Sequence, residues 1–389
     1  MFKGPRFVRA LEAAGHRVTV VTGFPNYPDG KLHPGYRMRP VLRETLDGAR
    51  VVRLPLYPSH DASSLRRALN FVSFFVSALL YCLFRRQRFD IAYVYQPPVT
   101  VGLAAALAGL VRPLPYMLDI QDLWPDSVAA TGMRGARALA WLLRPVCRFV
   151  HARAAAILVQ SEGMRRTLIA RGIAPDRIVT ILNWADADSP PDPARNTARD
   201  IFTMVYGGNL GRAQALSTVV EAAAIVERQR RDIRLHLYGD GIDAARLAEQ
   251  ADELSVTILD FPGRVSRAEI ARRSAAADAL LLHLADDPLF AITIPTKTQA
   301  YLAYGRPIVA GIAGEAAGLL ERSGAALVVP PQDASALAAA ICRLADLPAA
   351  ERAAMGRRGR QFYETHLAFD RAIARTLSAI AGTYRRSCS

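Results

Sequence analysis

The residues best suited to chemistry stand at 295–298, where Lys297 lies between two threonines just after Pro295. Proline is favoured in the first turn of a helix and glycine at its left-handed end, so Pro295 and Gly305 predict a helix between them. The backbone N–H groups and the dipole of such a start favour an anion, and Lys297 adds a positive charge. We therefore expect this turn to bind the phosphates of a nucleotide. The alternative, an ordinary core helix with a Pro/Thr start, stays open at this point.

Three carboxylates form a second candidate group. Asp119, Asp122 and Asp126 stand at or just after the end of an apolar run at 115–120, which predicts a buried strand. Loops at the carboxyl ends of parallel strands are where α/β sheets bind ligands. These carboxylates suit an acid, a base or a hydroxyl-binding group near a sugar. They equally suit turn carboxylates and helix caps.

Two glycine-rich turns follow predicted strands in the second half of the chain. The strand at 202–206 enters the turn 207–214, and the strand at 233–238 enters the turn 239–241. Glycine lets the backbone come close to a phosphate or a sugar. Arg212, in the first turn, suits either a contact with a diphosphate or a solvated surface position.

The composition limits the classes of partner. The chain has 389 residues, of which 51% are hydrophobic, and this length predicts two domains with large cores. The formal net charge is +14, which favours anionic partners: nucleic acid, anionic lipid or phosphorylated substrates. Lysine occurs only at positions 3, 31 and 297, so nearly all of the positive charge is arginine.

The cysteines stand at positions 82, 147, 342 and 388 and show no metal-binding spacing. They predict free thiols in a reducing compartment and no metal site. No cleavable signal peptide is visible at the start of the sequence. These features favour a cytoplasmic protein.

The most apolar stretch, 68–84, has arginines on both sides. It lies at the lower edge of the ~18–20 residues that a membrane span needs. A predicted strand at 90–95 follows closely, which favours a helix that packs on a sheet. Three interpretations stay open: a helix buried against the sheet, a helix that contacts an anionic bilayer surface, and a true span.

A linker divides the chain into two regions of alternating strands and helices. The stretch 188–200, rich in Pro and Asp, predicts this linker. We expect one α/β domain at 1–187, a second at 201–365 and a closing helical segment at 366–389. The first domain opens on a helix, although a doubly wound domain would place a strand and a glycine turn before it. We therefore expect its first strand to be missing.

Ordered motifs connect these predictions to a known family. In the second half they are Gly-Gly-Asn-Leu-Gly-Arg-Ala-Gln at 207–214, Gly-Asp-Gly at 239–241, Pro-Gly-Arg-Val at 262–265 and Pro-Thr-Lys-Thr-Gln-Ala-Tyr at 295–301. In the first half they are Phe-Pro-Asn-Tyr-Pro at 24–28, Asp-Leu-Trp-Pro-Asp-Ser at 122–127 and Asn-Trp at 183–184. The set resembles the retaining glycosyltransferases of family 4, which have the GT-B fold. It is similar to the branch that builds O-antigen, capsule or exopolysaccharide.

The resemblance implies two facing Rossmann-like, doubly wound domains and a C-terminal helix that crosses back to the first. The second domain would bind a nucleotide-sugar, such as a UDP-linked N-acetylated amino sugar or deoxy sugar. The first would bind a polyprenyl-diphosphate-linked saccharide as acceptor. The enzyme would work with retention and without a metal or other cofactor. It would lie on the inner face of the cytoplasmic membrane, at an anionic surface, with no nucleic-acid partner.

The resemblance also assigns roles to residues. The donor would contact Gly208, Asn209, Arg212, Gln214, Gly239, Gly241, Arg264, Pro295, Thr296, Lys297 and Gln299. The acceptor would contact Asn26, Tyr27, Trp124 and Asp126. The catalytic residues would be Arg212 and Lys297, which take up charge from the leaving diphosphate, and Asp122 or Asp119, which orients the acceptor hydroxyl.

The chain departs from the family pattern at the donor site. Asn209 and Gln214 stand where many relatives carry an arginine and a lysine, so Arg212 and Lys297 would replace these cations. The family's paired glutamates would fall at Ile292 and Ala300 and are absent. Gln299 and backbone groups would then make the contacts expected of those carboxylates.

Three rival functions remain at this stage. A nucleotide-sugar 2-epimerase shares the fold, but the Asp-Leu-Trp-Pro segment favours a transferase. A nucleic-acid binder would show a basic stripe interleaved with aromatic residues, whereas the arginines here are dispersed. An inactive, truncated glycosyltransferase is the third, because of the missing first strand.

Overall fold

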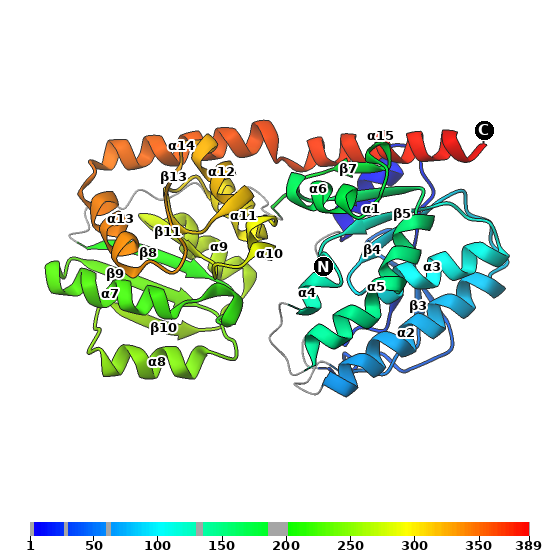
Figure 1. Cartoon of the computed structure of the whole chain (residues 1–389), viewed down its shortest axis with the longest axis horizontal. Helices are drawn as coiled ribbons and strands as arrows, with labels where there is room; N and C mark the ends of the chain where they lie inside the picture. Colours follow the sequence, from blue (N-terminus) through cyan, green and yellow to red (C-terminus); the bar gives the residue numbers. More distant parts are fainter. Residues whose placement is uncertain (1–3, 27–29, 60–63, 130–134, 186–200, 389) are drawn as a thin grey trace. The chain divides into compact units, whose positions relative to one another are not determined.

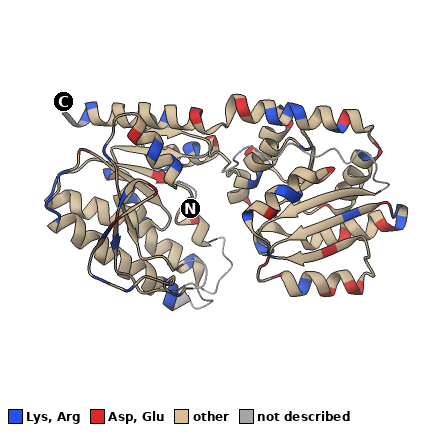
Figure 2. Cartoon of the chain, turned by 180° about the vertical axis from the view of Figure 1, so that it is seen from behind, with Lys and Arg blue, Asp and Glu red and all other residues tan. Residues whose placement is uncertain are grey.

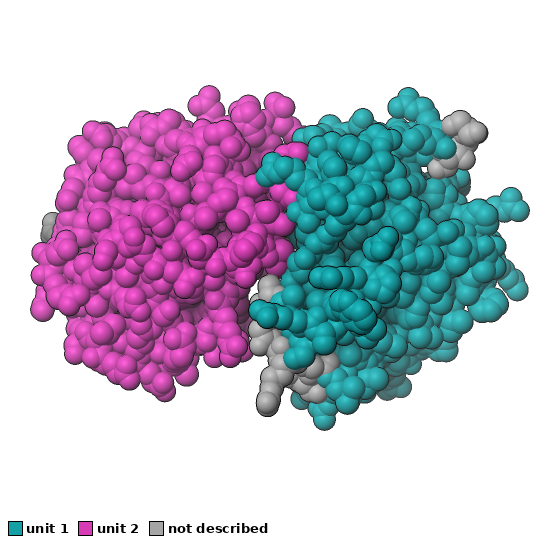
Figure 3. Space-filling model, viewed as in Figure 1, with its two compact units in different colours: residues 1–160, 164–181, 373–389 teal, residues 161–163, 182–372 magenta. Residues whose placement is uncertain are grey.

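The computed structural model describes residues 4–26, 30–59, 64–129, 135–185 and 201–388. The chain divides into two compact units, coloured separately in Figure 3. Unit 1 comprises Met1–Gln160, Met164–Ile181 and Ile373–Ser389, and unit 2 comprises Ser161–Gly163 and Leu182–Ala372. The predicted linker at 188–200 lies outside the described residues.

Unit 2 is built on one parallel sheet with the strand order β10-β9-β8-β11-β12-β13 (Figure 1). The strands are β8 (Phe202–Gly207), β9 (Ile233–Tyr238), β10 (Leu259–Gly263), β11 (Ala279–His283), β12 (Ile308–Gly311) and β13 (Ala326–Val329). The helices are α7 (Ser217–Gln229), α8 (Ala244–Glu253), α9 (Arg267–Ala276), α10 (Pro288–Ala291), α11 (Thr296–Tyr304), α12 (Gly314–Ser323), α13 (Ala334–Asp346) and α14 (Ala349–His366). The order reverses at β8, as in doubly wound sheets, so the predicted α/β fold of this half is confirmed.

Apolar side chains cover both faces of this sheet. On one face Val219 of α7, Leu247 of α8 and Ile341 of α13 belong to one core. On the other, Leu302 of α11 and Leu320 of α12 belong to a second. Because both faces are buried, the central strands are continuously apolar rather than alternating.

Two helix signals predicted from the sequence are confirmed in unit 2. Gly305 ends α11 in the left-handed region, with φ 65°. Asp333 caps α13, and its carboxylate accepts a hydrogen bond from the backbone N–H of Ala336 at 2.8 Å. These local rules therefore fix where the two helices stop and start.

Unit 1 contains two sheets. One has the order β1-β3-β2, with β1 (Thr19–Gly23) parallel and β2 (Leu42–Leu46) antiparallel to β3 (Ala49–Leu54). The other is parallel, with the order β4-β5-β6-β7, formed by β4 (Ala92–Gln96), β5 (Tyr116–Ile120), β6 (Ala156–Val159) and β7 (Ile178–Thr180). Within the described ranges, β1 pairs only with β3, and β4 pairs only with β5. A doubly wound domain would have one continuous sheet, so the expected sheet is divided here.

Helices connect the two sheets of unit 1. They are α1 (Pro5–Ala13), α2 (Ser64–Phe84), α3 (Val99–Val111), α4 (Asp126–Ala129), α5 (Ala136–Arg153) and α6 (Glu162–Ala170), whose first residues are assigned to unit 2. Phe7 of α1 lies against Tyr93 of β4, with ring centres 5.3 Å apart. Ala78 of α2 and Ala104 of α3 pack together with Leu54 of β3. The hydrophobic core is therefore shared although the strands are not.

The apolar stretch of the sequence forms α2, which packs on α3 and β3 by one side only. Only 6% of the window Leu65–Phe84 is buried, and Leu65, Val72 and Phe84 are 71%, 50% and 78% exposed. The wholly buried helix is therefore not what the structure shows. Among the described helices, α2 has the length and composition to cross a membrane, which by itself is weak grounds for a span.

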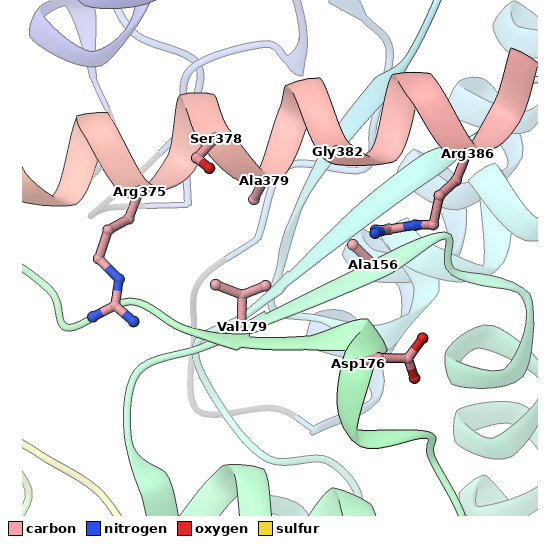
Figure 4. A pocket seen from close by; sticks show the side chains of 8 residues that line it. All are labelled: Ala156, Asp176, Val179, Arg375, Ser378, Ala379, Gly382 and Arg386. Atoms are coloured by element: carbon pink, nitrogen blue, oxygen red, sulfur yellow. The ribbon is translucent and has the colours of Figure 1, made fainter.

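The last helix, α15 (Phe369–Cys388), starts in unit 2, and its residues from Ile373 onward belong to unit 1. A hollow of about 270 Å³ lies between α15, β6 and β7 in unit 1. Figure 4 shows Arg375 and Arg386 extending from α15 toward these strands, with Asp176 nearby. The hollow lies at the amino ends of the strands, away from the edge where α/β sheets bind ligands.

Candidate functional site

Three turns meet at the carboxyl edge of the unit 2 sheet. Gly208 N–H donates to Tyr238 O at 2.9 Å, and Gly239 N–H donates to Gly263 O at 3.0 Å. Gly239 has φ 147°, and a Cβ there would overlap Gly208 O. Glycine is therefore required by close backbone contact, and the turns after β8, β9 and β10 form one backbone surface.

Lys297 of α11 approaches the first of these turns. Its Nζ lies 3.8 Å from the centre of the Tyr206 ring and donates a hydrogen bond to Tyr206 Oη. A Cβ on Gly208 would overlap Nζ, so this glycine makes room for the amine. Burial lowers the pKa of Lys297 to about 7. The structure thus brings together Gly208 and Lys297, which were both predicted for the donor site.

The start of α11 differs in detail from the prediction. The helix begins at Thr296, with Pro295 as its N-cap residue, one position later than expected. Thr296 is exposed at this end. Gln299 is fully buried, with 0% exposure, so its predicted contact with donor hydroxyls is wrong for this conformation. The reason is that Gln299 faces the core side of α11, beside the buried Thr298.

The remaining predicted donor residues occupy the rims of the turns. Asn209 and Gln214 bind each other, with Nδ2 donating to Oε1 at 3.2 Å. Arg212 begins the short 3-10 helix Arg212–Gln214 and is exposed, and Arg264 is exposed after β10. Contact of these two exposed arginines with the donor stays a prediction.

Gly241, the second glycine of the turn after β9, packs against the backbone of the first turn, because a Cβ there would overlap Leu210 O.

His283 was not singled out in the sequence, yet it supports the first turn from below. Its Nδ1 lies 2.8 Å from Gln214 O and must donate, since a carbonyl only accepts. Its Nε2 accepts from Gln332 N–H at 3.3 Å. Burial lowers the pKa of His283, which keeps this neutral tautomer. A polar residue that ends an otherwise apolar strand was the available signal.

Asp119 is the next-to-last residue of β5 in unit 1 and is 2% exposed. One carboxylate oxygen accepts from Tyr93 Oη at 2.5 Å, and the other accepts from Gln121 Nε2 at 2.6 Å. Both oxygens already accept hydrogen bonds inside the protein, and the group is buried, so these contacts favour a structural role for Asp119 at the carboxyl end of β5. Its role with a substrate hydroxyl stays an untested prediction.

Asp122 differs from Asp119 because it is exposed, two residues after β5. Partial burial of the carboxyl group raises its pKa. A carboxylate that is accessible and poorly solvated suits a group that accepts a hydrogen bond from a substrate hydroxyl. Of the two candidates in this region, the geometry favours Asp122.

The predicted acceptor residues belong to unit 1. Asp126 is the first residue of α4 and pairs with Arg171, the residue that follows α6, at 2.5 Å. Asn26 donates to Phe24 O at 2.9 Å, and Trp124 is half-buried. Tyr27 lies outside the described residues. A common role for these residues at an acceptor stays a prediction.

No group of three or more His, Cys, Asp and Glu able to hold a metal ion occurs among the described residues. Metal-independent catalysis stays a prediction. Figure 2 shows the positions of Asp and Glu along the ribbon interspersed with those of Lys and Arg on both units, and no single basic stripe crosses the view. This distribution does not favour a nucleic-acid interface.

Solved structures with the same fold include the sucrose-phosphate synthase of Thermosynechococcus elongatus, with a TM-score of 0.72 at 19% identity. That alignment covers 98% of this chain and 93% of the other. Anabaena HepE, solved in complex with UDP and glucose, has a TM-score of 0.66 at 16% identity, with 86% and 87% covered. These likenesses establish the two-domain GT-B fold.

Sequence comparison gives the family. Residues 5–184 match the model of the glycosyl transferase 4-like domain, and residues 201–346 match that of the glycosyl transferases group 1. The glycosyl transferase WcaI of Escherichia coli K12, assigned to colanic acid biosynthesis, is 27% identical over 372 residues, with 88% of this chain and 87% of WcaI covered. Both family models describe transferases, so the epimerase alternative is not favoured. The chain belongs to the family 4 glycosyltransferases of GT-B fold.

Proposed function

We propose that this glycosyltransferase moves a sugar, with retention, from a nucleotide-sugar to a polyprenyl-diphosphate-linked saccharide in surface polysaccharide assembly. The observation that carries the proposal is the approach of the Lys297 amine to the turn at Gly208, beside the start of α11. A diphosphate placed there would meet a cation, backbone N–H groups and a helix dipole together. Unit 2 would thus hold the donor, and unit 1 the acceptor.

The relatives support the chemical class of both substrates. HepE was solved with UDP, which supports a uridine diphosphate donor. WcaI is assigned to colanic acid biosynthesis, which supports a polysaccharide product. An N-acetylated amino sugar or a deoxy sugar remains our expectation for the sugar.

In the proposed reaction the bond between the sugar and the diphosphate breaks while Lys297, Arg212 and the start of α11 stabilise the growing charge. Such preorganised stabilisation is usually the largest catalytic contribution. The acceptor hydroxyl attacks the same face of the sugar, and a diphosphate oxygen takes its proton. Asp122 in unit 1 orients that hydroxyl.

Lys297→Ala tests the donor site, with Lys31→Ala as its control, since Lys31 is exposed in unit 1. We expect Lys297→Ala to weaken UDP binding at least about tenfold, because a charge-assisted contact to phosphate is lost. Titration calorimetry with UDP, in the presence of a chelator, measures this. Equal binding by the two variants would contradict the assignment of the diphosphate to Lys297.

The exposed face of α2 is the proposed membrane contact, and the enzyme would lie on the inner face of the cytoplasmic membrane. Its exposed apolar residues are Leu65, Leu69, Phe71, Val72, Val76, Leu80 and Phe84. Arginines at 66, 67, 85 and 86 flank the face, which matches the headgroups of anionic lipids. A polyprenyl-linked acceptor would reach the enzyme from this surface.

Vesicle flotation tests the contact. We expect the wild-type protein to float with vesicles that contain phosphatidylglycerol and to float less with phosphatidylcholine alone. Val72→Asp should abolish flotation, whereas Leu254→Asp, at a 45% exposed leucine of unit 2, should not. Flotation of the Val72→Asp protein at the wild-type level would refute a role for α2.

A further inference from the structure

The amine of Lys297 contacts a phenol and not a carboxylate. Tyr206 of β8 provides both the ring under its Nζ and the oxygen that accepts its hydrogen bond. No salt bridge to Lys297 occurs within the described ranges, and burial alone lowers its pKa. Tyr206 is the titratable group that contacts the amine, and Tyr301 of α11 lies near enough to Tyr206 to raise the pKa of that phenol further. Among the described residues, the amine therefore has no carboxylate as a counter-charge.

The Tyr206 hydroxyl both donates and accepts a hydrogen bond. Its proton goes to Asn209 O, at 2.7 Å, in the glycine-rich turn. Burial raises the pKa of Tyr206, so the phenol stays neutral and keeps this proton. Its oxygen is then left to accept from Lys297. One hydroxyl thereby connects the turn after β8 to the lysine of α11.

Tyr301 provides a comparison within the same site. It is 3% exposed, and Tyr206 is 0% exposed. The Tyr301 hydroxyl accepts from Gly207 N–H at 3.1 Å, so it also supports the turn. It makes no hydrogen bond with Lys297 in the described structure. Both tyrosines therefore support the turn, but only Tyr206 also binds the lysine amine, so a comparison of the two distinguishes these roles.

We propose that Tyr206 is a positioning residue that holds Lys297 without a protein counter-ion, so that the bound diphosphate supplies the missing charge and donor binding takes up a proton from solvent. This inference rests on the proposed donor site. The balance is simple: a neutral amine and one proton give the ammonium ion, which then pairs with a phosphate oxygen. An ordinary surface lysine, already protonated, would take up none.

Calorimetry with UDP at pH 8, in buffers with different ionisation enthalpies, tests the proton uptake. At this pH the terminal phosphate of UDP, with a pKa near ~6, is already ionised. We expect wild-type protein to take up most of a proton for each UDP bound. Lys297→Arg should bind UDP with almost no uptake, because a guanidinium stays protonated. Binding by the wild type with no uptake would overturn this proposal and leave the donor site standing, whereas no UDP binding at all would count against the donor site itself.

Tyr206→Phe, compared with Tyr301→Phe, tests the positioning role. We expect Tyr206→Phe to weaken UDP binding about tenfold, as for loss of a hydrogen bond that positions a charged group, and to shift the pH dependence of binding. Tyr301→Phe should change binding less than about threefold and leave the pH dependence unchanged. The same pH dependence in both variants would refute the role of Tyr206. Thermal melts check folding, and if Tyr206→Phe does not fold, the comparison of wild type with Lys297→Arg decides.

Discussion

The turns of unit 2 and the carboxyl end of β5 in unit 1 are stabilised by different kinds of hydrogen bond. In unit 2 the contacts are mainly between backbone groups, since the turns at Gly208 and Gly239 bind the ends of neighbouring strands through main-chain hydrogen bonds. At the carboxyl end of β5 the contacts are between side chains, because Tyr93 and Gln121 donate hydrogen bonds to Asp119. Backbone contacts tolerate no added atom, whereas a side-chain network depends on the identity of each member. The two regions should therefore fail under different substitutions.

The sheets of the two units differ as well. Every residue of β11, in the middle of the unit 2 sheet, is buried. Every residue of β1 is only half-buried, and β4 is only partly buried. Both β1 and β4 have an edge that no described strand covers. β5 of unit 1 is as fully buried as β11, so the difference is that unit 1 divides its strands between two sheets, each with its own uncovered edges, whereas unit 2 has a single sheet.

The largest effect is expected at Gly239. Gly239→Ala should lower the free energy of unfolding by about 3 kcal/mol, because the new Cβ overlaps Gly208 O and the backbone must shift. Gly15→Ala in unit 1 is the control, with φ 89° and nothing within 4 Å of a Cβ. It should cost about 1 kcal/mol of backbone strain. Urea unfolding measures both, and equal losses would remove the contrast between the two regions.

Lys297→Met sharpens the comparison through pH. The pKa of Lys297 is lowered from 10.5 to about 7, so the unfolded chain binds more protons between these values and stability rises with pH across this window. The buried amine is therefore costly below pH 7 and harmless above about 10.5. We expect the methionine variant to be more stable by about 3 kcal/mol at pH 8, with a gap that closes toward pH 10. Unfolding curves at several pH values should show this, and a gap that is constant with pH would be inconsistent with a buried, uncharged amine.

A smaller effect is expected in unit 1. Asp119→Asn replaces an oxygen that accepts a hydrogen bond by a donor, and should destabilise the protein by about 1–3 kcal/mol. Asp122→Asn, at the exposed carboxylate, should change stability by less than about 0.5 kcal/mol. Similar losses from both substitutions, measured by urea unfolding, would mean that Asp122 is also part of the supporting network.

Local rules and family motifs carried the sequence prediction a long way. The alternation of strands and helices, the end of α11 at Gly305 and the cap at Asp333 all depend on a few adjacent residues, and all are found. The antiparallel β2 was missed, because an edge strand with the sequence Leu-Arg-Glu-Thr-Leu carries no clear apolar run. The closing helical segment was expected at 366–389, and α15 runs from Phe369 to Cys388.

The site residues were harder to predict than the elements that carry them. Lys297 could be identified from its position at a helix start. Tyr206 could not, because a tyrosine in an apolar strand is indistinguishable from core until its hydroxyl partners are known. Gln299 was expected at the ligand as a replacement for the family's paired glutamates, but it lies on the buried side of α11. Such properties depend on which side of an element meets its neighbour, and the pattern of a single chain does not contain this.

The division of α15 between the units has a consequence for synthesis on the ribosome. Thr376 and Thr383 of this helix are fully buried, and Ile380 is 8% exposed, so unit 1 needs them to complete its interior. They are translated after every residue of unit 2. The half of the protein that is begun first is therefore the half that is finished last, and it must wait with an uncovered surface while the other half emerges and folds.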